Sequence, residues 1–320
     1  MNLPLALALG ALRSPFRRPG HGVTVTPGRW RLAEPDVRID PDRLAAYARV
    51  CGFSESGPVP LPYPHVLGFP LTMRLMAARD FPLPLLGLVH TWITVTRHRA
   101  LLPAERLQLT VHVAALTPHR RGTEVTVATE AHVAGEPVWE SRSGYLARHG
   151  TPDAVATGPG PASTPGRAPA PTPGLGSAQA PGPGRSPGPA PGPGPAPTPD
   201  PGPAPAPPHA PLAARAEWRL ASDLGRRYGR VSGDRNPIHL HPLSARVFGF
   251  PRPIAHGMWT FARCVAELSP PHAAHVEAEF RAPVPLPSTV TYAADGDRFE
   301  LRGDGGRPYL TGTATSAARP

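Results

Sequence analysis

The sequence predicts an α+β fold made of two similar units that are separated by a long disordered segment. Of the 320 residues, 49 are proline and 33 are glycine, and about 22 of the prolines lie in residues 151–212. This segment has too little apolar and aromatic side-chain content to offset the entropy cost of ordering it. We therefore expect one unit in residues 1–150, a disordered Pro/Ala/Gly-rich linker in residues 151–212, and a second unit in residues 213–320.

The first unit is predicted to contain two helices followed by four strands. Asp40-Pro-Asp42 places acidic residues at the start of an amphipathic helix over residues 43–50. A second helical pattern covers about Phe69–Arg79, and Asp80-Phe-Pro ends it. Alternating apolar and β-branched residues after that point predict strands. These strands cover residues 87–97, 106–114, 123–133 and 138–148.

The second unit is predicted to follow the same order, with most of its strands after its helices. A short strand is expected over residues 217–220, and a helix over residues 223–228. A longer helix is expected over residues 257–268. The strands that follow are expected over residues 275–281, 288–294, 299–302 and 309–315.

A short internal repeat relates the two units. Residues 62–69, Pro-Tyr-Pro-His-Val-Leu-Gly-Phe, match residues 251–258, Pro-Arg-Pro-Ile-Ala-His-Gly-Met, at both prolines, the glycine and the final apolar residue. Strands follow both copies, so we expect that one α+β unit has been duplicated. Two such units can pair their sheets edge to edge within one chain, as the subunits of a homodimer would.

The charge of the chain excludes some classes of function. All 33 basic residues are arginine, and with 23 acidic residues they give a net charge of +10. Without lysine, Schiff-base and lysine general-base chemistry are excluded. The positive excess is spread over both units and forms no block or tail, which argues against nucleic-acid binding and is compatible with an anionic small ligand.

The cysteines and the N-terminus bear on the cellular compartment. Cys51 and Cys264 are far apart and outside any metal-type spacing, as in a reduced intracellular protein. The apolar stretch over residues 3–12 has no basic residue before it and is too short to span a bilayer. We therefore expect a cytoplasmic protein that does not bind membranes.

The sharpest chemical feature is the stretch Ser232-Gly-Asp234-Arg-Asn236-Pro-Ile-His239, which follows the predicted helix over residues 223–228. Asp234 and His239 are too far apart to be neighbours on a regular helix, but a loop with glycine and proline can bring them onto one small molecule. The alternative is an ordinary Asx-turn with a histidine on the surface.

A second feature, Pro253-Ile-Ala-His256-Gly257-Met258, lies at the start of the predicted helix over residues 257–268. The unpaired N–H of Gly257 at this helix N-terminus can bind a developing oxyanion. The alternative is that Gly257 only permits close packing.

Together, residues 228–258 resemble the hydratase-2 motif of the MaoC-like dehydratases. That motif is a tyrosine, then Ser-Gly-Asp-x-Asn-Pro-Ile/Leu-His, then Gly-Phe-x-x-Pro-Ile-x-His-Gly-Met, and every part of it is present here. The resemblance is close over about 30 residues and extends from Trp218 to the end, with Pro287-Ser288 in place of the usual Gly-Asp. It implies a double hot-dog fold, in which a degenerate leading unit and a second, catalytic unit form a pseudo-dimer.

The resemblance also implies the activity of a hydro-lyase, which adds water to trans-2-enoyl thioesters to give the R alcohol or removes it from 3-hydroxyacyl thioesters. Asp234 and His239 would activate the water and transfer the proton, and the N–H of Gly257 would stabilise the oxyanion. Asn236 and Ser232 would orient this pair. No metal or redox cofactor is implied, and CoA or an acyl-carrier protein would carry the acyl group.

The leading unit lacks the Asp-x-Asn-x-x-x-His pattern, and the resemblance implies that it widens or lines the acyl cavity. Met73 and Met76 are expected to line it, with plain core packing as the alternative. Arg252 and Arg281 are candidates for contacting the phosphates of CoA. By the repeat, His65 and His90 fall near the cavity, yet they are expected to be packing or surface residues. His241 and His256 are expected to be structural or exposed.

Two other functions are left open. One is a non-catalytic acyl-thioester-binding or scaffold module whose linker recruits partners, and the other is a hot-dog thioesterase. The presence of both Asp234 and His239 favours water addition over each of them. The sequence does not specify the acyl chain, its carrier, the direction of the reaction, a fatty-acid or polyketide-type pathway, or whether the chain forms a homodimer.

Overall fold

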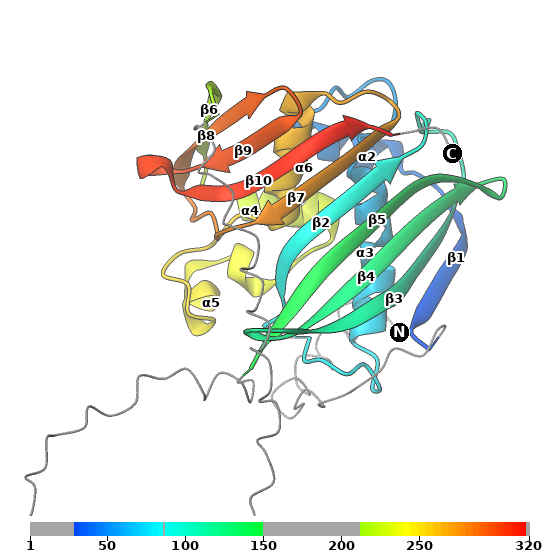
Figure 1. Ribbon diagram of the computed structural model, residues 1–320, viewed down its shortest axis with the longest axis horizontal. Coiled ribbons are helices and arrows are strands. Elements are labelled where there is room, and N and C mark those ends of the chain that lie inside the picture. The colour runs from blue at the N-terminus through cyan, green and yellow to red at the C-terminus, as the bar shows by residue number, and fades with distance from the viewer. Residues whose placement is uncertain (1–28, 86, 150–211, 318–320) are drawn as a thin grey trace, which may run out of the picture. The chain divides into compact units, whose positions relative to one another are not determined.

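The computed structural model describes residues 29–85, 87–149 and 212–317 (Figure 1). The apolar stretch over residues 3–12 and the predicted disordered linker, apart from its last residue Leu212, lie outside the described residues. None of the helices in these ranges has the length and apolar character needed to cross a membrane.

A ten-stranded antiparallel sheet runs through the described residues in the order β1-β3-β4-β5-β2-β7-β10-β9-β8-β6. Each half of the chain supplies five consecutive strands in the same relative order (Figure 1). The strands are β1 Arg31–Val37, β2 Val89–Arg97, β3 Leu107–His119, β4 Gly122–Val133, β5 Glu136–Arg148, β6 Ala214–Leu220, β7 Ala274–Phe280, β8 Ser288–Asp295, β9 Arg298–Arg302 and β10 Pro308–Ser316.

The two halves join where β2 pairs with β7, from Trp92 opposite Glu279 to Arg97 opposite Ala274. This is the edge-to-edge pairing of two duplicated units that the repeat predicts. The α+β class and the double hot-dog fold, both expected from the sequence, are therefore confirmed.

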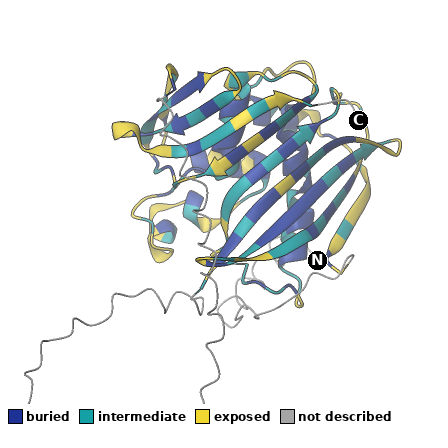
Figure 2. Cartoon of the chain, in the orientation of Figure 1, coloured by how far each residue is buried: buried dark blue, intermediate teal, exposed yellow. Residues whose placement is uncertain are grey.

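The helices lie on one face of this sheet (Figure 1). In the first half α3 packs against β1, β3 and β4, and in the second half α6 packs against β9. Buried and more exposed residues alternate along several strands, as in β3 (Figure 2), so one face of the sheet is buried. The helices are α2 Pro41–Cys51, α3 Tyr63–Met76, α4 Leu224–Ser232, α5 Pro242–Val247 and α6 Gly257–Leu268, with 3₁₀ turns at Pro237–His239 and Asp304–Gly306.

Helix α2 connects the halves, because it packs against α4 and α6 of the other half. Its Tyr47 is fully buried, with ring centroids 4.9 Å from Tyr63 and 6.1 Å from Tyr228. The indole of Trp259 also donates to the main-chain oxygen of Val50 at 3.0 Å. These contacts bury apolar surface from both halves in one core, so the halves stabilise each other.

Several expectations about the elements need correction. Helix α3 begins at Tyr63 instead of Phe69, because proline fits the first turn of a helix and Pro64 lies there. The predicted helix over residues 223–228 continues to Ser232. The edge strand β1 was not expected, since it contains Pro35 and is mostly exposed, which leaves no clear alternation of apolar residues.

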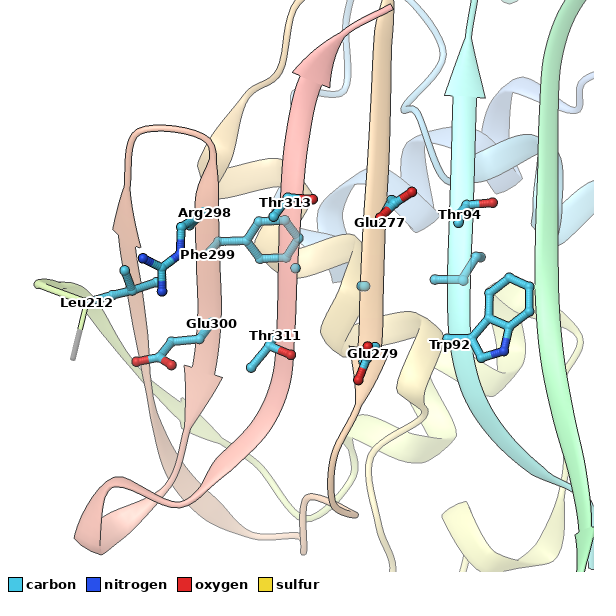
Figure 3. A pocket seen from close by; sticks show the side chains of 13 residues that line it. Trp92, Thr94, Leu212, Glu277, Glu279, Arg298, Phe299, Glu300, Thr311 and Thr313 are labelled. Carbon is cyan, nitrogen blue, oxygen red and sulfur yellow. The ribbon is translucent and has the colours of Figure 1, made fainter. Parts of the chain in front are cut away.

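The outer face of the sheet, opposite the helices, has a depression of about 370 Å³ across the junction of β2 and β7 (Figure 3). Polar side chains such as Thr94, Glu277, Thr311 and Thr313 line it together with apolar ones such as Leu212 and Phe299. The residues of the two sequence motifs do not line it.

Candidate active site

Two glycines of α4 let the loop that follows this helix lie directly on it. A Cβ atom on Gly225 would come within 1.9 Å of the main-chain oxygen of His239, and one on Gly229 within 2.7 Å of that of Asp234. The helix ends at Gly233, whose left-handed conformation with φ of 83° reverses the chain. The sequence therefore brings Asp234 and His239 back onto one helix.

Hydrogen bonds within the loop fix its conformation. The N–H of Asp234 donates to Ser232 Oγ at 3.2 Å, and the N–H of Asn236 donates to Asp234 Oδ1 at 3.1 Å. The amide oxygen of Asn236 accepts from the N–H of Ile238 at 3.4 Å, which starts the 3₁₀ turn. Ser232 and Asn236 thus hold the backbone on both sides of Asp234.

His239 is not the surface histidine of the alternative interpretation, because only 8 % of it is exposed. Its Nδ1 lies 2.8 Å from the main-chain oxygen of Ile254, so Nδ1 carries the proton and donates. This assignment leaves Nε2 as an acceptor. Burial lowers the pKa of His239 and the nearby charge of Asp234 opposes that shift, so the ring is neutral at neutral pH.

His256 completes the cluster and is 2 % exposed, in line with the expected structural position. Its ring stacks on that of His239 with centroids 3.7 Å apart, and its Nε2 lies 3.0 Å from the main-chain oxygen of Asp234. One side-chain atom each of Asp234, His239 and His256 lie within 4.8 Å of one another. Burial, followed by repulsion from His239, lowers the pKa of His256 to about 3.

Such a cluster has the residue types of a metal site, but its nitrogens are partly engaged. Nδ1 of His239 and Nε2 of His256 both lie within hydrogen-bond distance of main-chain oxygens. The arrangement suits an acid–base pair with a supporting histidine better than a site with three free ligand atoms.

Helix α6 begins at Gly257, beside this cluster. Its N-cap residue His256 makes no side-chain capping bond, so the first N–H groups of the helix are not capped by a side chain. A Cβ atom on Gly257 would lie 3.1 Å from the ring of Phe280, so the glycine also permits close packing. Both interpretations of Gly257 are therefore compatible with its surroundings.

A cavity of about 1200 Å³ contains this cluster and is lined by both halves of the chain. Asp234, His239, Gly257, Ser232 and Asn236 all line it. The apolar side chains that the first half contributes include Val66, Phe69, Met73, Met76, Leu85 and Leu88.

Of the residues expected to bind substrate, Met73, Met76 and Arg281 line the cavity, whereas Arg252 does not. Arg252 is exposed and donates to the main-chain oxygen of Pro287 at 3.3 Å. Nη2 of Arg281 lies 2.7 Å from the carboxylate of Glu279, which also borders the cavity. Arg252 is close to the motif in sequence, but its side chain contacts Pro287 instead of the cavity.

His65, His90 and Tyr145 of the first half also line the cavity. The repeat places His65 and His90 near the cavity, although they were expected to be packing or surface residues, whereas Tyr145 was not predicted. A signal for them exists in β5, where the inward positions Ser141, Ser143 and Tyr145 are polar although the strand lies inside the sheet. His241 matches its expectation, because it is exposed and caps α5.

Comparison with known proteins shows which family this chain resembles. A family model described as a MaoC like domain matches residues 204–297. The chain is 33% identical over 285 residues to 3-hydroxyacyl-thioester dehydratase X of Mycobacterium tuberculosis, covering 87% of this chain and 86% of that protein. The crystal structure of HtdX from the same organism superimposes with a TM-score of 0.67 at 30% identity, covering 90% of this chain and all of that one. A MaoC-like dehydratase from Phytophthora capsici, at 18% identity and a TM-score of 0.61, covers 89% of this chain and 95% of its own and shares the fold.

Proposed function

The chain belongs to the MaoC-like dehydratase family, and on that premise we propose that it is a hydro-lyase that hydrates trans-2-enoyl thioesters and dehydrates 3-hydroxyacyl thioesters. The observation that carries this proposal is the position of Asp234 and His239. They lie together on the wall of one cavity, five residues apart in a loop that α4 holds.

In the hydration direction, Asp234 and Nε2 of His239 hold one water molecule and remove a proton from it. The water oxygen forms a bond to the β-carbon of the enoyl group, and the electron pair of the double bond moves onto the thioester oxygen. The N–H of Gly257 stabilises this enolate. The proton held by the pair then moves to the α-carbon, which completes the addition of one water with the R configuration.

The supporting residues act on the geometry of this pair. Ser232 and Asn236 hold the loop through their hydrogen bonds, and the Nδ1 bond of His239 to Ile254 keeps Nε2 unprotonated. Because burial favours the neutral imidazole, His239 is available as a base at neutral pH. These features support acid–base chemistry over simple binding.

The carrier of the acyl group is proposed to be CoA or an acyl-carrier protein. Arginines at the cavity suit the phosphates of either carrier. Those that line it are Arg120, Arg121, Arg148, Arg235 and Arg281. The free and buried Cys51 and Cys264 agree with a reducing compartment such as the cytoplasm.

We also propose that the chain is divided into a leading unit of residues 1–150, a linker of residues 151–212 and a catalytic unit of residues 213–320. The catalytic loop and α6 belong to the last part, while both parts line the cavity and the first part adds the apolar residues of α3 to it. In this division the first part shapes the cavity and the last part performs the reaction.

The direct test is to incubate the purified full chain with trans-2-enoyl-CoA of several chain lengths. We expect the absorbance of the conjugated thioester to fall and an R 3-hydroxyacyl-CoA to form. Release of free CoA thiol would instead identify a thioesterase, and binding without turnover would identify a binding module. Either result would overturn the proposal.

A further inference from the structure

Among the polar aromatic side chains that the first half places in the cavity, three stack on one another, and they have no part in the mechanism above. We call His65, His90 and Tyr145 the polar wall. His90 and Tyr145 are opposite each other on β2 and β5, with ring centroids 4.6 Å apart and an interplanar angle of 17°. The ring of His65 lies nearly parallel to that of His90, with centroids 6.3 Å apart. The wall is therefore one continuous stack.

The polar wall contacts residues of the catalytic unit. The ring of Phe280 lies 4.6 Å from that of His90, and the same ring would meet a Cβ atom on Gly257 at 3.1 Å. The negative charge of Asp234 raises the pKa of both His65 and Tyr145. The wall thus faces the catalytic groups across the cavity.

Part of the hydrogen-bonding capacity of the polar wall is unused. The Tyr145 hydroxyl bonds to Ser143, but Nε2 of His90 is buried without a partner among the described residues, and Nδ1 of His65 has only a 3.4 Å contact to Oγ of Ser141. A buried polar group without a partner destabilises a fold, and apolar side chains would fill this space without that cost. The missing partners therefore point to a ligand.

The wall is uncharged at neutral pH. Burial lowers the pKa of His65 to about 4 and that of His90 to about 3, and it raises the pKa of the Tyr145 phenol. A neutral imidazole offers one donor and one acceptor, and a phenol offers both. Such groups suit a neutral oxygen, whereas a carboxylate would also meet the negative charge of Asp234.

The position of the wall along the cavity indicates where this oxygen lies. His65, Phe69, Met73 and Met76 follow one face of α3 at helical spacing, and all four line the cavity. From His65 the helix extends for about 16 Å to Met76. The polar end is beside the catalytic groups, and the residues further along are apolar.

We propose that the polar wall binds a second oxygen on the acyl chain, so that the preferred substrates are enoyl thioesters with a hydroxyl or keto group beyond the double bond and an alkyl tail after it. This substrate class rests on the proposed function. The wall donates to or accepts from that oxygen, while the apolar face of α3 contacts the tail.

The test compares trans-2-enoyl-CoA substrates of equal length, one unsubstituted and the others with a keto or hydroxyl group moved stepwise along the chain. The measured quantity is the ratio of kcat/KM for the oxygenated substrate to that for the plain one. We expect a ratio of roughly ten or more at the best position in the native protein, the effect of one satisfied hydrogen bond or more.

Three variants then locate the effect: Tyr145→Phe, which removes only a hydroxyl, His90→Phe and His65→Leu. We expect the ratio to fall about tenfold towards one in at least one of them. His275→Leu, on the outer face of the sheet, is the matched control and should leave the ratio and both activities unchanged. Thermal unfolding checks that each variant is folded.

The inference is wrong if the native protein shows no preference for any oxygenated chain, or if all three variants keep the native ratio. These results would leave the proposed function intact, since plain enoyl-CoA would still be hydrated. If neither kind of substrate is hydrated, the proposed function itself fails and this inference fails with it.

Discussion

Nε of Arg43 donates to the main-chain oxygen of Val231 at 2.7 Å, although the two residues are 188 positions apart in the chain. Its Nη2 also donates to the main-chain oxygen of Ser232 at 3.1 Å. Val231 and Ser232 end α4, where main-chain oxygens have no partner within the helix. A side chain of the first half therefore stabilises the end of the helix that positions Asp234.

This contact predicts that Arg43 is a positioning residue for the catalytic loop. Arg43→Gln should lower kcat by about tenfold and change KM little, because the loop shifts while the acyl cavity remains. Arg43→Lys should recover part of the loss, since it keeps the positive charge at the helix C-terminus. Steady-state kinetics on plain enoyl-CoA measures both.

The control for Arg43 is Arg49→Gln, on the same helix. Arg49 pairs with Glu55 on the surface, so kcat should stay at the native value. If Arg43→Gln raises KM alone, or leaves both parameters unchanged, the positioning role is wrong.

The catalytic pair gives the second prediction. Asp234→Asn and His239→Ala should each lower kcat/KM at least about a hundredfold, as expected when acid–base catalysis is lost. The double variant should lose little more than the worse single one, because the two groups act as a unit. An unchanged rate in either single variant, with native thermal unfolding, would contradict the mechanism.

Much of the fold could be predicted because most elements carry one clear periodicity. The helix over Gly257–Leu268 has the expected bounds, since its apolar residues recur at helical spacing after a glycine. The edge strand β1 could not be predicted, because a strand paired on one side only has no need of alternating apolar residues. Hydrophobic periodicity therefore fails to predict a strand that is mostly exposed.

The residues of the site also fall into those that local sequence predicts and those that it does not. Asp234, His239 and Gly257 lie in two short motifs, so their proximity could be inferred from local sequence. His65, His90 and Tyr145 come from a helix and two strands, and only the pairing of β2 with β5 brings the last two together. Proximity in sequence also misled for Arg252, whose side chain contacts Pro287 instead of the cavity.

The glycines around the loop give a third, graded prediction. Gly225→Ala should lower the free energy of unfolding by about 3 kcal/mol or more, since its methyl group would meet the main chain of His239 at 1.9 Å. Gly257→Ala should cost far less, because the ring of Phe280 can move and alanine favours a helix. Urea unfolding of both variants checks the order, and equal losses would contradict it.

The linker gives a fourth prediction. Shortening residues 151–212 to roughly twenty residues should leave folding and hydratase activity intact, because the two halves already share one core and one sheet. Twenty residues that behave as a random coil have a root-mean-square reach of roughly 25 Å. Solubility, thermal unfolding and activity of the deletion variant check this, and loss of soluble protein would mean that the segment is structural.

The buried histidines predict a loss of stability in acid. The pKa of His65 is lowered to about 4, and those of His90 and His256 to about 3, against an ordinary value of 6.5. Burial is the main cause for all three; the charge of Asp234 opposes it at His65 and His256, and repulsion between neighbouring histidines adds to it at His90 and His256. Below pH 6.5 the unfolded chain therefore binds protons that the native protein does not, and the free energy of unfolding falls as the pH falls.

Each of these histidines should contribute a slope of about 1.4 kcal/mol per pH unit between roughly pH 6 and pH 4. Urea unfolding at several pH values measures the slope directly. His90→Phe removes one titrating group from the polar wall, so its slope should be smaller by about 1.4 kcal/mol per pH unit. Tyr145→Phe is the matched control, because a phenol with a raised pKa does not titrate in acid and the slope should stay native. Equal slopes for His90→Phe and the native protein would show that His90 takes up its proton as readily in the folded chain as in the unfolded one, and would remove the evidence that this wall is uncharged.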